Sequence, residues 1–415
     1  MQLSRCGSCP LLALPYPDQL AQKHASLKAQ LAPVLSLLDP TQAPTLRAPV
    51  ASPDALGYRY SVKLVTQPSE RGPRVGLYRP GTHEVIDTQG CPVQSAPINA
   101  LLDVLRATLK EPGAPSLYDE RLKVGALRYI VIREAFAPAG ASPELHMTLI
   151  SREDSAPIRA LAQRLTERSS CALGVSVHVN SSDGNAIFDW SSEPLMHMIS
   201  GGGSLTSLFT LNPTCAPLQL RASVESFSQV NPSAATLAYR AVVEGLSPSS
   251  AEVALDLYCG VGSISLALAQ AGCAEVIGLE ESPSSVRDAQ MNATVNKLSA
   301  RFIEGLTELI LPAEVSRLTE AHPLPTPDAV RPVLVSLNPS RRGCQPEVIE
   351  SLAFLRPRRL AYMSCHPRTL IRDLKRFIAR GYQPTSLQLF DLFPGTPHFE
   401  VVCVIEPMTP AHSKI

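Results

Sequence analysis

A short stretch in the second half of the chain, residues 253–280, constrains its fold most strongly. It opens with an apolar run of strand length, residues 253–258, and passes through a glycine turn, residues 259–263, into an apolar helical segment. A second apolar run, residues 274–280, follows. This order is typical of a parallel βαβ unit. Because strand and helix patterns keep alternating to about residue 405, we expect an α/β fold with a mostly parallel, Rossmann-like sheet and helices on both faces.

The same stretch carries the residues of a nucleotide-binding turn. Glycines let the backbone approach a ligand, and an acidic residue after the next strand accepts hydrogen bonds from ribose hydroxyls. Gly260 and Gly262 supply the glycines, and Glu280 follows Asp256 by 24 residues. A dinucleotide site favours G-x-G-x-x-G, whereas this chain has D-x-x-x-G-x-G, a form more typical of S-adenosylmethionine (SAM). We therefore predict a SAM-binding domain, with a generic Rossmann-like fold as the alternative.

The rest of the chain divides by pattern into further parts, and 415 residues suffice for two or three domains. Residues 1–50 hold a cysteine-containing segment and a helix from about Asp18, and residues 39–54 read as a linker rich in Pro, Ala and Thr. Residues 51–215 predict a central α+β domain on an antiparallel sheet, and residues 216–415 the α/β domain. In the central domain we expect strands at 57–65, 75–79, 127–133, 145–151 and 174–180, helices at 97–110 and 155–168, and a hairpin loop at 201–204.

Cys365 lies where a predicted strand, residues 360–363, gives way to a helix that Pro367 can open. Helix N-termini carry partial positive charge and unpaired N–H groups, which favour a thiolate and lower the pKa of a cysteine. The position therefore suits a nucleophile. A buried structural thiol is the alternative, and Cys365 alone does not distinguish the two.

Three other segments carry polar residues that bear on a site, and the first ends at the carboxyl edge of the predicted sheet. Residues 333–343 form a strand followed by a loop with Asn338 and Arg341. Glu400 begins a very apolar strand and is of interest if it shares a cleft with Cys365. Residues 226–232 lead into a helix that Asn231 or Ser228 can cap.

The N-terminal cysteines suggest a metal or an iron–sulfur cluster. Cys6 and Cys9 form a C-x-x-C, whose two thiolates can face one centre, and Cys91 lies at a predicted turn. Three unrelated thiols remain the alternative.

Composition narrows the class of protein. Apolar residues make up 45% of the chain, and its 37 basic and 37 acidic residues give zero net charge, so a strongly basic nucleic-acid binder is not indicated. The sequence contains no apolar run of roughly 18 residues and no signal-peptide pattern, so we expect a cytoplasmic protein without membrane segments. Its ten cysteines are then reduced thiols, metal ligands or catalytic groups.

Four stretches together resemble the RNA uracil-5-methyltransferase family. They are residues 227–231 (FSQVN), residues 255–263 (LDLYCGVGS), Ser364-Cys365, and Phe393-Pro394 with residues 398–400 (HFE), in the order that the family has. The C-x-x-C and Cys91 extend the resemblance to the iron–sulfur branch that acts on 23S ribosomal RNA. With no room before Cys6 for a further N-terminal barrel, the chain looks like the shorter, RlmC-like members.

The resemblance implies a role for each matching residue. Cys365 would be the nucleophile and Glu400 the base, and Gln229, Tyr258, Glu280 and Asn338 would contact SAM. Cys6, Cys9 and Cys91 would hold a [4Fe-4S] cluster. The central domain would bind RNA through basic and aromatic residues, although solvated strand faces explain these residues equally well. We expect a monomer.

Three departures from the family pattern bear on these roles. The usual loop Asp-Pro-Pro-Arg is Asn338-Pro339-Ser340-Arg341 here, and His366 replaces an asparagine after the nucleophile. A further cysteine that members carry before the C-x-x-C has no counterpart in residues 1–5. Three explanations stay open: the protein starts upstream of Met1, a group other than cysteine completes the cluster site, or the cluster has been lost.

The departures keep other functions open. They are methylation of a tRNA uridine, a SAM enzyme acting on a small molecule or protein with a structural Cys365, and a catalytically silent RNA-binding iron–sulfur protein.

Overall fold

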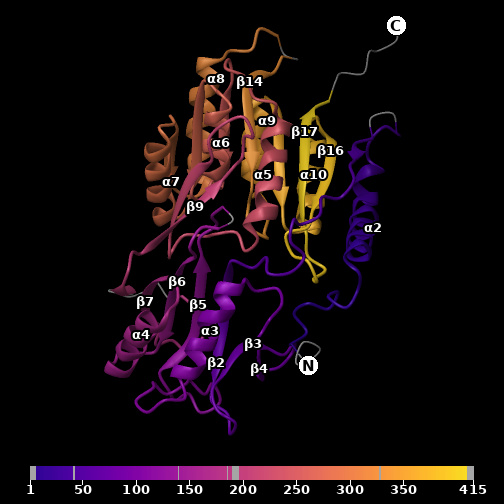
Figure 1. Ribbon diagram of the computed structural model, residues 1–415. Coiled ribbons are helices and arrows are strands. Elements are labelled where there is room, and N and C mark those ends of the chain that lie inside the picture. Colours follow the sequence, from indigo (N-terminus) through magenta and orange to yellow (C-terminus); the bar gives the residue numbers. More distant parts are fainter. Residues whose placement is uncertain are drawn as a thin grey trace.

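The computed structural model describes residues 6–40, 43–138, 140–184, 186–188, 196–326 and 329–408. These residues form two large sheets, one above the other in Figure 1, and a separate sheet of two strands. Eight strands within these residues form the larger one, here called the C-terminal sheet. Their spatial order is β1 (Thr45–Leu46), β16 (Tyr382–Phe390), β17 (Glu400–Pro407), β15 (Pro357–Ser364), β14 (Arg331–Leu337), β11 (Val253–Leu257), β12 (Glu275–Glu280) and β13 (Arg301–Glu304).

The centre of the C-terminal sheet is parallel, as the sequence predicts. Strands β15, β14, β11, β12 and β13 pair in parallel, whereas β17 runs antiparallel between β15 and β16. Strands β16 and β17 follow each other in the chain, and a short loop can join antiparallel neighbours without a crossover helix.

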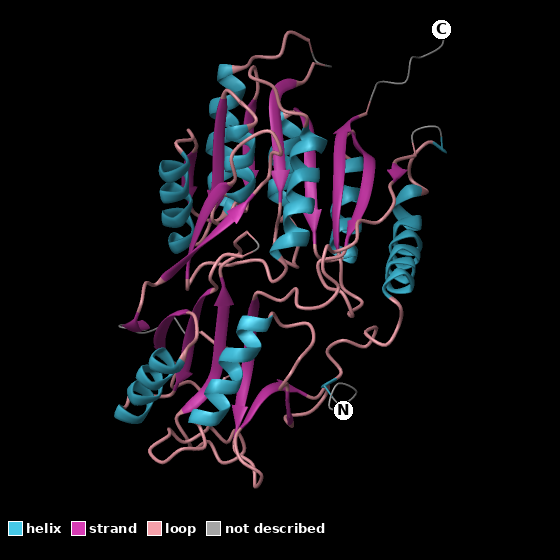
Figure 2. Ribbon diagram, viewed as in Figure 1, coloured by secondary structure: helices cyan, strands magenta, loops and turns pink. Residues whose placement is uncertain are grey.

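Helices cover both faces of this sheet (Figures 1 and 2), so its parallel strands are buried on both sides. One hydrophobic core includes residues of α2 (Tyr16–Leu35), α8 (Thr307–Ala321), α9 (Pro346–Leu355) and α10 (Pro367–Ile378). The core on the other face includes α5 (Pro232–Leu246), α6 (Ser263–Gln270) and α7 (Pro283–Asn296). The predicted α/β fold is therefore confirmed. The predicted cap is confirmed as well, because the Asn231 side chain accepts a hydrogen bond from the Ala234 N–H at 3.1 Å at the start of α5.

The smaller, N-terminal sheet confirms the predicted α+β character with one correction. Among the described residues its order is β4 (Val85–Asp87), β3 (Arg74–Tyr78), β2 (Ser61–Gln67), β5 (Leu127–Glu134), β6 (Glu144–Ser151), β7 (Ala172–Val179) and β8 (Met196–Ser200). Helices α3 (Ala96–Thr108) and α4 (Ala156–Arg168) contribute to its core. The sheet is not wholly antiparallel, because α4 connects β6 to β7 as a crossover and these two strands pair in parallel.

The prediction of a hairpin loop at residues 201–204 is wrong, because the strands on its two sides do not pair with each other. Strand β8 belongs to the N-terminal sheet, whereas the following β9 (Ser204–Phe209) pairs with β10 (Leu218–Ser223) in a separate hairpin. The second edge of β10 is bound by α7, because Asn292 and Asn296 accept hydrogen bonds from the Arg221 and Gln219 N–H groups at 2.7 and 2.9 Å. The chain therefore leaves the N-terminal sheet at the glycines and enters this separate hairpin.

The predicted linker at residues 39–54 is partly paired. Thr45 and Leu46 lie parallel to Ser386 and Leu387, and Val50 forms a bridge to Phe390. Helix α2 packs against α10, so this N-terminal region lies against the C-terminal sheet. The domain boundaries at residues 50 and 215 stay predictions. In the described part of the chain, no helix combines the length and apolar character needed to cross a membrane.

Candidate active site

A cavity of about 940 Å³ lies where the parallel strands of the C-terminal sheet end. Tyr258, Asn338 and Cys365 each directly follow the end of a strand. They lie close together because the carboxyl ends of parallel strands meet at one edge of a sheet. The cavity is lined by all six residues predicted to bind SAM or to catalyse, namely Gln229, Tyr258, Glu280, Asn338, Cys365 and Glu400. The structure thus brings them together, and their individual roles stay predictions.

The glycine turn packs closely against β13 and α7. Gly262 has φ +85° and begins α6, and a Cβ there would lie 3.1 Å from the Phe302 ring and 3.2 Å from Ala289. The Gly260 N–H donates to Glu280 Oε2 at 2.9 Å, and Glu280 Oε1 accepts from the Ser282 N–H at 2.9 Å. The Glu280 carboxylate is therefore fixed beside the turn, where ribose hydroxyls are expected.

Asp256 ties this turn to the sheet beneath it. Its buried carboxyl accepts hydrogen bonds from Ser265 of α6, at 2.6 Å, and from Ser336 of β14. Burial raises the pKa of Asp256 to about 6, against the effect of these bonds.

The remaining predicted cofactor residues are also held by the surrounding structure. Gln229 Nε2 donates to the Tyr239 hydroxyl at 3.1 Å, and the Asn338 N–H donates to the Leu257 carbonyl at 3.3 Å. Tyr258 has φ +63°, a left-handed conformation that is strained for a tyrosine and is often found at functional sites.

Cys365 is half-buried between β15 and α10. Burial raises the pKa of its thiol, the Glu400 carboxyl raises it further, and the charge and hydrogen bond of the Arg341 guanidinium lower it. The lowered pKa predicted from the helix N-terminus is therefore wrong for this structure, because desolvation is the largest effect on this thiol and raises its pKa. Arg341 is the group that favours the thiolate.

Glu400 is the first residue of β17 and is 5% exposed. Burial raises the pKa of its carboxyl to about 8, with the Arg341 charge acting in the opposite direction. A carboxylate with a raised pKa is a stronger base, and a value near the working pH suits general acid–base catalysis. Glu400 and Cys365 both respond to Arg341, so the three groups form one electrostatic unit.

The second wall of the cavity was not predicted from the sequence. It contains Glu134, the last residue of β5, with Tyr60 just before β2 and Phe136 just after β5. The rings of Tyr60 and Phe136 meet edge to face, with their centroids 5.7 Å apart. Phe227 also lines the cavity and is 69% exposed, which suits stacking on a base. The motif at residues 227–231 marks Phe227, whereas Glu134 ends an apolar strand with no sequence signal.

The three N-terminal cysteines are near one another but do not form a ligand set. Burial raises the pKa of the Cys9 thiol, the Arg59 charge lowers it, and the neighbouring thiols of Cys91 and Cys6 raise it. Among the residues that the structure describes, no group of three or more Cys, His, Asp or Glu side chains is arranged to hold a metal ion. A four-thiolate cluster needs one donor more than these three supply.

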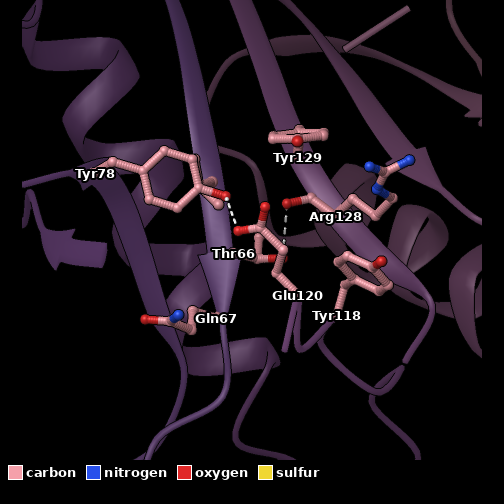
Figure 3. Close-up of a pocket in the computed structure, with 8 residues that line it drawn as sticks. Thr66, Gln67, Tyr78, Tyr118, Glu120, Arg128 and Tyr129 are labelled. Atoms are coloured by element: carbon pink, nitrogen blue, oxygen red, sulfur yellow. Dashed lines mark hydrogen bonds between the residues drawn. The ribbon is translucent and has the colours of Figure 1, made fainter. Parts of the chain in front are cut away.

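A second, much smaller pocket lies in the N-terminal sheet (Figure 3). It has about 10 Å³ of space, lined by Tyr78, Glu120, Tyr129 and others, and Tyr78 donates to Glu120 at 3.3 Å. That space suits about one water molecule. The 940 Å³ cavity is therefore the candidate active site.

Comparison with known proteins identifies the family. The model of the tRNA (uracil-5-)-methyltransferase family matches residues 216–407. A Gloeobacter violaceus protein described as an uncharacterized RNA methyltransferase is 31% identical over 97% of this chain and 81% of its own length. A Geobacter sulfurreducens protein with the same description is 31% identical over 99% of this chain and 77% of its own.

The fold is shared with a solved structure, the Pyrococcus abyssi tRNA (uracil-54, C5)-methyltransferase in complex with S-adenosyl-L-homocysteine. The TM-score is 0.72, at 21% identity, over 96% of this chain and 85% of that one. The family to which the sequence motifs point is thus confirmed. The chain belongs to the RNA (uracil-5-)-methyltransferase family and is a SAM-dependent enzyme that methylates C5 of uracil in RNA.

Proposed function

We propose that this enzyme methylates a uridine of 23S ribosomal RNA, with Cys365 as the nucleophile and Glu400 as the base. One observation carries the two catalytic roles. Cys365 and Glu400 line the same cavity as the predicted SAM residues, and both interact with Arg341. The enzyme acts as a monomer in the cytoplasm, a reducing compartment that suits its ten free cysteines.

Cys365 starts the reaction. C5 of uracil is too weak a nucleophile to attack a methyl sulfonium unaided. The Cys365 thiolate adds to C6, its thiol proton having left to solvent, and Arg341 stabilises this thiolate. The addition breaks the C5–C6 double bond and gives an enolate whose charge is shared by C5 and O4. Arg341 also lies where it can stabilise that charge.

Gln229, Tyr258, Glu280 and Asn338 hold SAM, which supplies the methyl group to C5 and leaves as S-adenosylhomocysteine. Glu400 then accepts the C5 proton, the C5–C6 double bond forms again, and the bond from C6 to the Cys365 sulfur breaks. The thiolate is regenerated, and the proton on Glu400 passes to solvent. The dry surroundings of Glu400 make its carboxylate basic enough for this step.

The ribosomal substrate is proposed from the sequence resemblance of Cys6, Cys9 and Cys91 to the iron–sulfur, RlmC-like branch. The alternative is a tRNA uridine, which the description of the matched family favours. The target base has to leave its stack to reach a half-buried cysteine, so single-stranded or flipped RNA is the expected form.

A [4Fe-4S] cluster at Cys6, Cys9 and Cys91 is proposed from the sequence resemblance alone, because the described side chains are not arranged to hold a metal ion and a fourth ligand has to come from another group. The catalytic steps above do not pass through it. Anaerobically purified protein should contain iron and acid-labile sulfide, and Cys9→Ser should lower both. Iron-free anaerobic protein that still methylates RNA would contradict the cluster.

The substrate is tested with unmodified transcripts of 23S ribosomal RNA and of tRNA, methylated with labelled SAM. We expect label in the 23S transcript as 5-methyluridine, and none with Cys365→Ala. Label in tRNA alone would replace the ribosomal substrate by the alternative. RNA and SAM binding without transfer to any RNA would favour a catalytically silent protein.

A further inference from the structure

The loop that leads to Glu400 is held by side chains from the far end of the chain. This β16–β17 loop, residues 391–399, connects two strands of the C-terminal sheet, and Phe393 and Glu400 both line the cavity. Cys365 lies on the neighbouring strand end, where Ser364 of β15 pairs with Val401 of β17. The loop therefore leads directly into Glu400, at the start of the strand that pairs beside Cys365.

A buried ion pair fixes the start of the loop. Lys23 Nζ of α2 lies 2.7 Å from Asp391 Oδ1, and their side chains are 1% and 0% exposed. Lys23 Nζ also donates to the Phe393 carbonyl at 3.0 Å, and the Phe393 N–H donates to Asp391 Oδ1 at 3.0 Å. Both peptide groups of Phe393, a residue of the cavity wall, are thus bound by this one pair.

The turn of the loop is fixed in the same way. The Gly395 N–H donates to the side chain of Gln19 at 2.7 Å, and the Leu11 N–H donates to the Gly395 carbonyl at 2.8 Å. The Tyr58 hydroxyl donates to the Pro394 carbonyl at 2.8 Å. Gln19 is itself buried, at 4% exposed, and its amide nitrogen donates to the Leu14 carbonyl at 3.0 Å.

We propose that Lys23 and Gln19 are positioning residues for the step that releases the methylated RNA. Through Asp391, Phe393 and Gly395 they hold the β16–β17 loop so that Glu400 reaches the C5 proton of the covalent intermediate. This inference rests on the proposed role of Glu400 as the base. Addition and methyl transfer depend on Cys365 and the SAM residues, none of which lies on this loop. Loss of the two anchors should therefore slow elimination more than the earlier steps.

The experiment uses the full-length protein, the RNA substrate and SAM in single turnovers, and follows the methylated protein–RNA adduct on denaturing gels. The main variant is Lys23→Met with Asp391→Asn, which removes both buried charges together and keeps an acceptor for the Phe393 N–H. Gln19→Ala tests the second anchor without touching a charge. Lys28→Met, at an exposed site of the same helix, is the matched control.

In both anchor variants we expect elimination to slow by roughly tenfold to a hundredfold, as for a catalytic group displaced by about 1 Å. The methylated adduct should accumulate, whereas the rate of adduct formation and the SAM affinity should stay within about twofold of the wild type. Lys28→Met should behave as the wild type.

Glu400→Gln is assayed in parallel to separate the two proposals. If Glu400→Gln accumulates adduct while folded anchor variants release RNA at the wild-type rate, the positioning role is overturned and the base stands. If addition, transfer and elimination all fall in proportion to folded protein, Lys23 and Gln19 are structural and the positioning role is again overturned. If Glu400→Gln itself releases RNA at the wild-type rate, the proposed base fails.

Discussion

At the scale of single residues, the site depends on a carboxyl group kept away from water. Glu400 is nearly fully buried, and burial raises its pKa to about 8. The Arg341 charge offsets part of that rise in the pKa of Glu400 and also favours the thiolate of Cys365. One guanidinium thus acts on both the proposed nucleophile and the proposed base.

The pKa of Glu400 sets the pH dependence of elimination. Only the carboxylate form accepts the C5 proton, so the elimination rate should rise by roughly tenfold per pH unit below about 8 and flatten above it. Single-turnover decay of the methylated adduct between pH 6 and 9 measures this rate. A rate that is level across this range, or that falls as the pH rises, would contradict the assignment.

The same burial predicts an effect on stability. The pKa of Glu400 is about 8 in the folded protein and 4.5 ordinarily, so the folded state binds this proton more tightly. Stability from this group is therefore lost as the pH rises from about 4.5 to 8. Glu400→Gln should gain stability relative to the wild type across that window, by a few kcal/mol at about 1.4 kcal/mol per pKa unit. Urea unfolding at pH 5 and pH 9 measures the difference, and an equal difference at both would speak against the raised pKa.

Arg341 is expected to control how readily Cys365 ionises. Without its guanidinium, only a backbone hydrogen bond would oppose the rise in the pKa of the Cys365 thiol that burial and the Glu400 carboxyl cause. In Arg341→Met the pH profile of adduct formation should shift to higher pH, and the rate at pH 7 should fall by roughly tenfold or more. Arg342→Met, at the next exposed position, is the control and should leave the profile in place. Identical profiles for the two variants would exclude this role.

At the scale of elements, local patterns predicted most of the strands and helices. The glycine turn, the strand before Cys365 and the helix after Pro367 all form where the sequence indicates them. The partners of strands were harder to predict, because pairing depends on residues far apart in the chain. Thr45 pairs with Ser386, and residues 201–203 connect two different sheets instead of forming a hairpin.

The glycine turn offers a test at this scale. Gly262 and Gly272 both have positive φ, but a Cβ at Gly262 would press on Phe302 and Ala289, whereas the space around Gly272 is open. Both alanine variants carry the strain of a left-handed backbone, of about 1–2 kcal/mol, and Gly262→Ala adds an overpacking cost of about 1–3 kcal/mol. It should also weaken SAM binding, measured by calorimetry. Equal stability and equal SAM affinity in the two variants would argue against this account of the turn.

At the scale of the whole molecule, the cavity is built by regions that are distant in sequence. The resemblance to the family implied roles for Cys365, Glu400 and the SAM residues, and all of them line one cavity. The motifs did not predict the wall formed by Tyr60 and Phe136, or the pairing of Lys23 with Asp391, 368 positions away. Such contacts arise only when the two sheets and α2 come together, and local periodicity does not contain that information.

The central claim, covalent catalysis by Cys365 within this cavity, is tested most directly with RNA that carries 5-fluorouridine at the target site. Fluorine at C5 cannot leave as a proton, so the reaction should stop as a protein–RNA adduct with one transferred methyl group, seen by intact mass. The account predicts this adduct for the wild type and its loss in Cys365→Ala. An adduct of equal yield in Cys365→Ala, or none from wild-type enzyme that methylates the unfluorinated RNA, would contradict it.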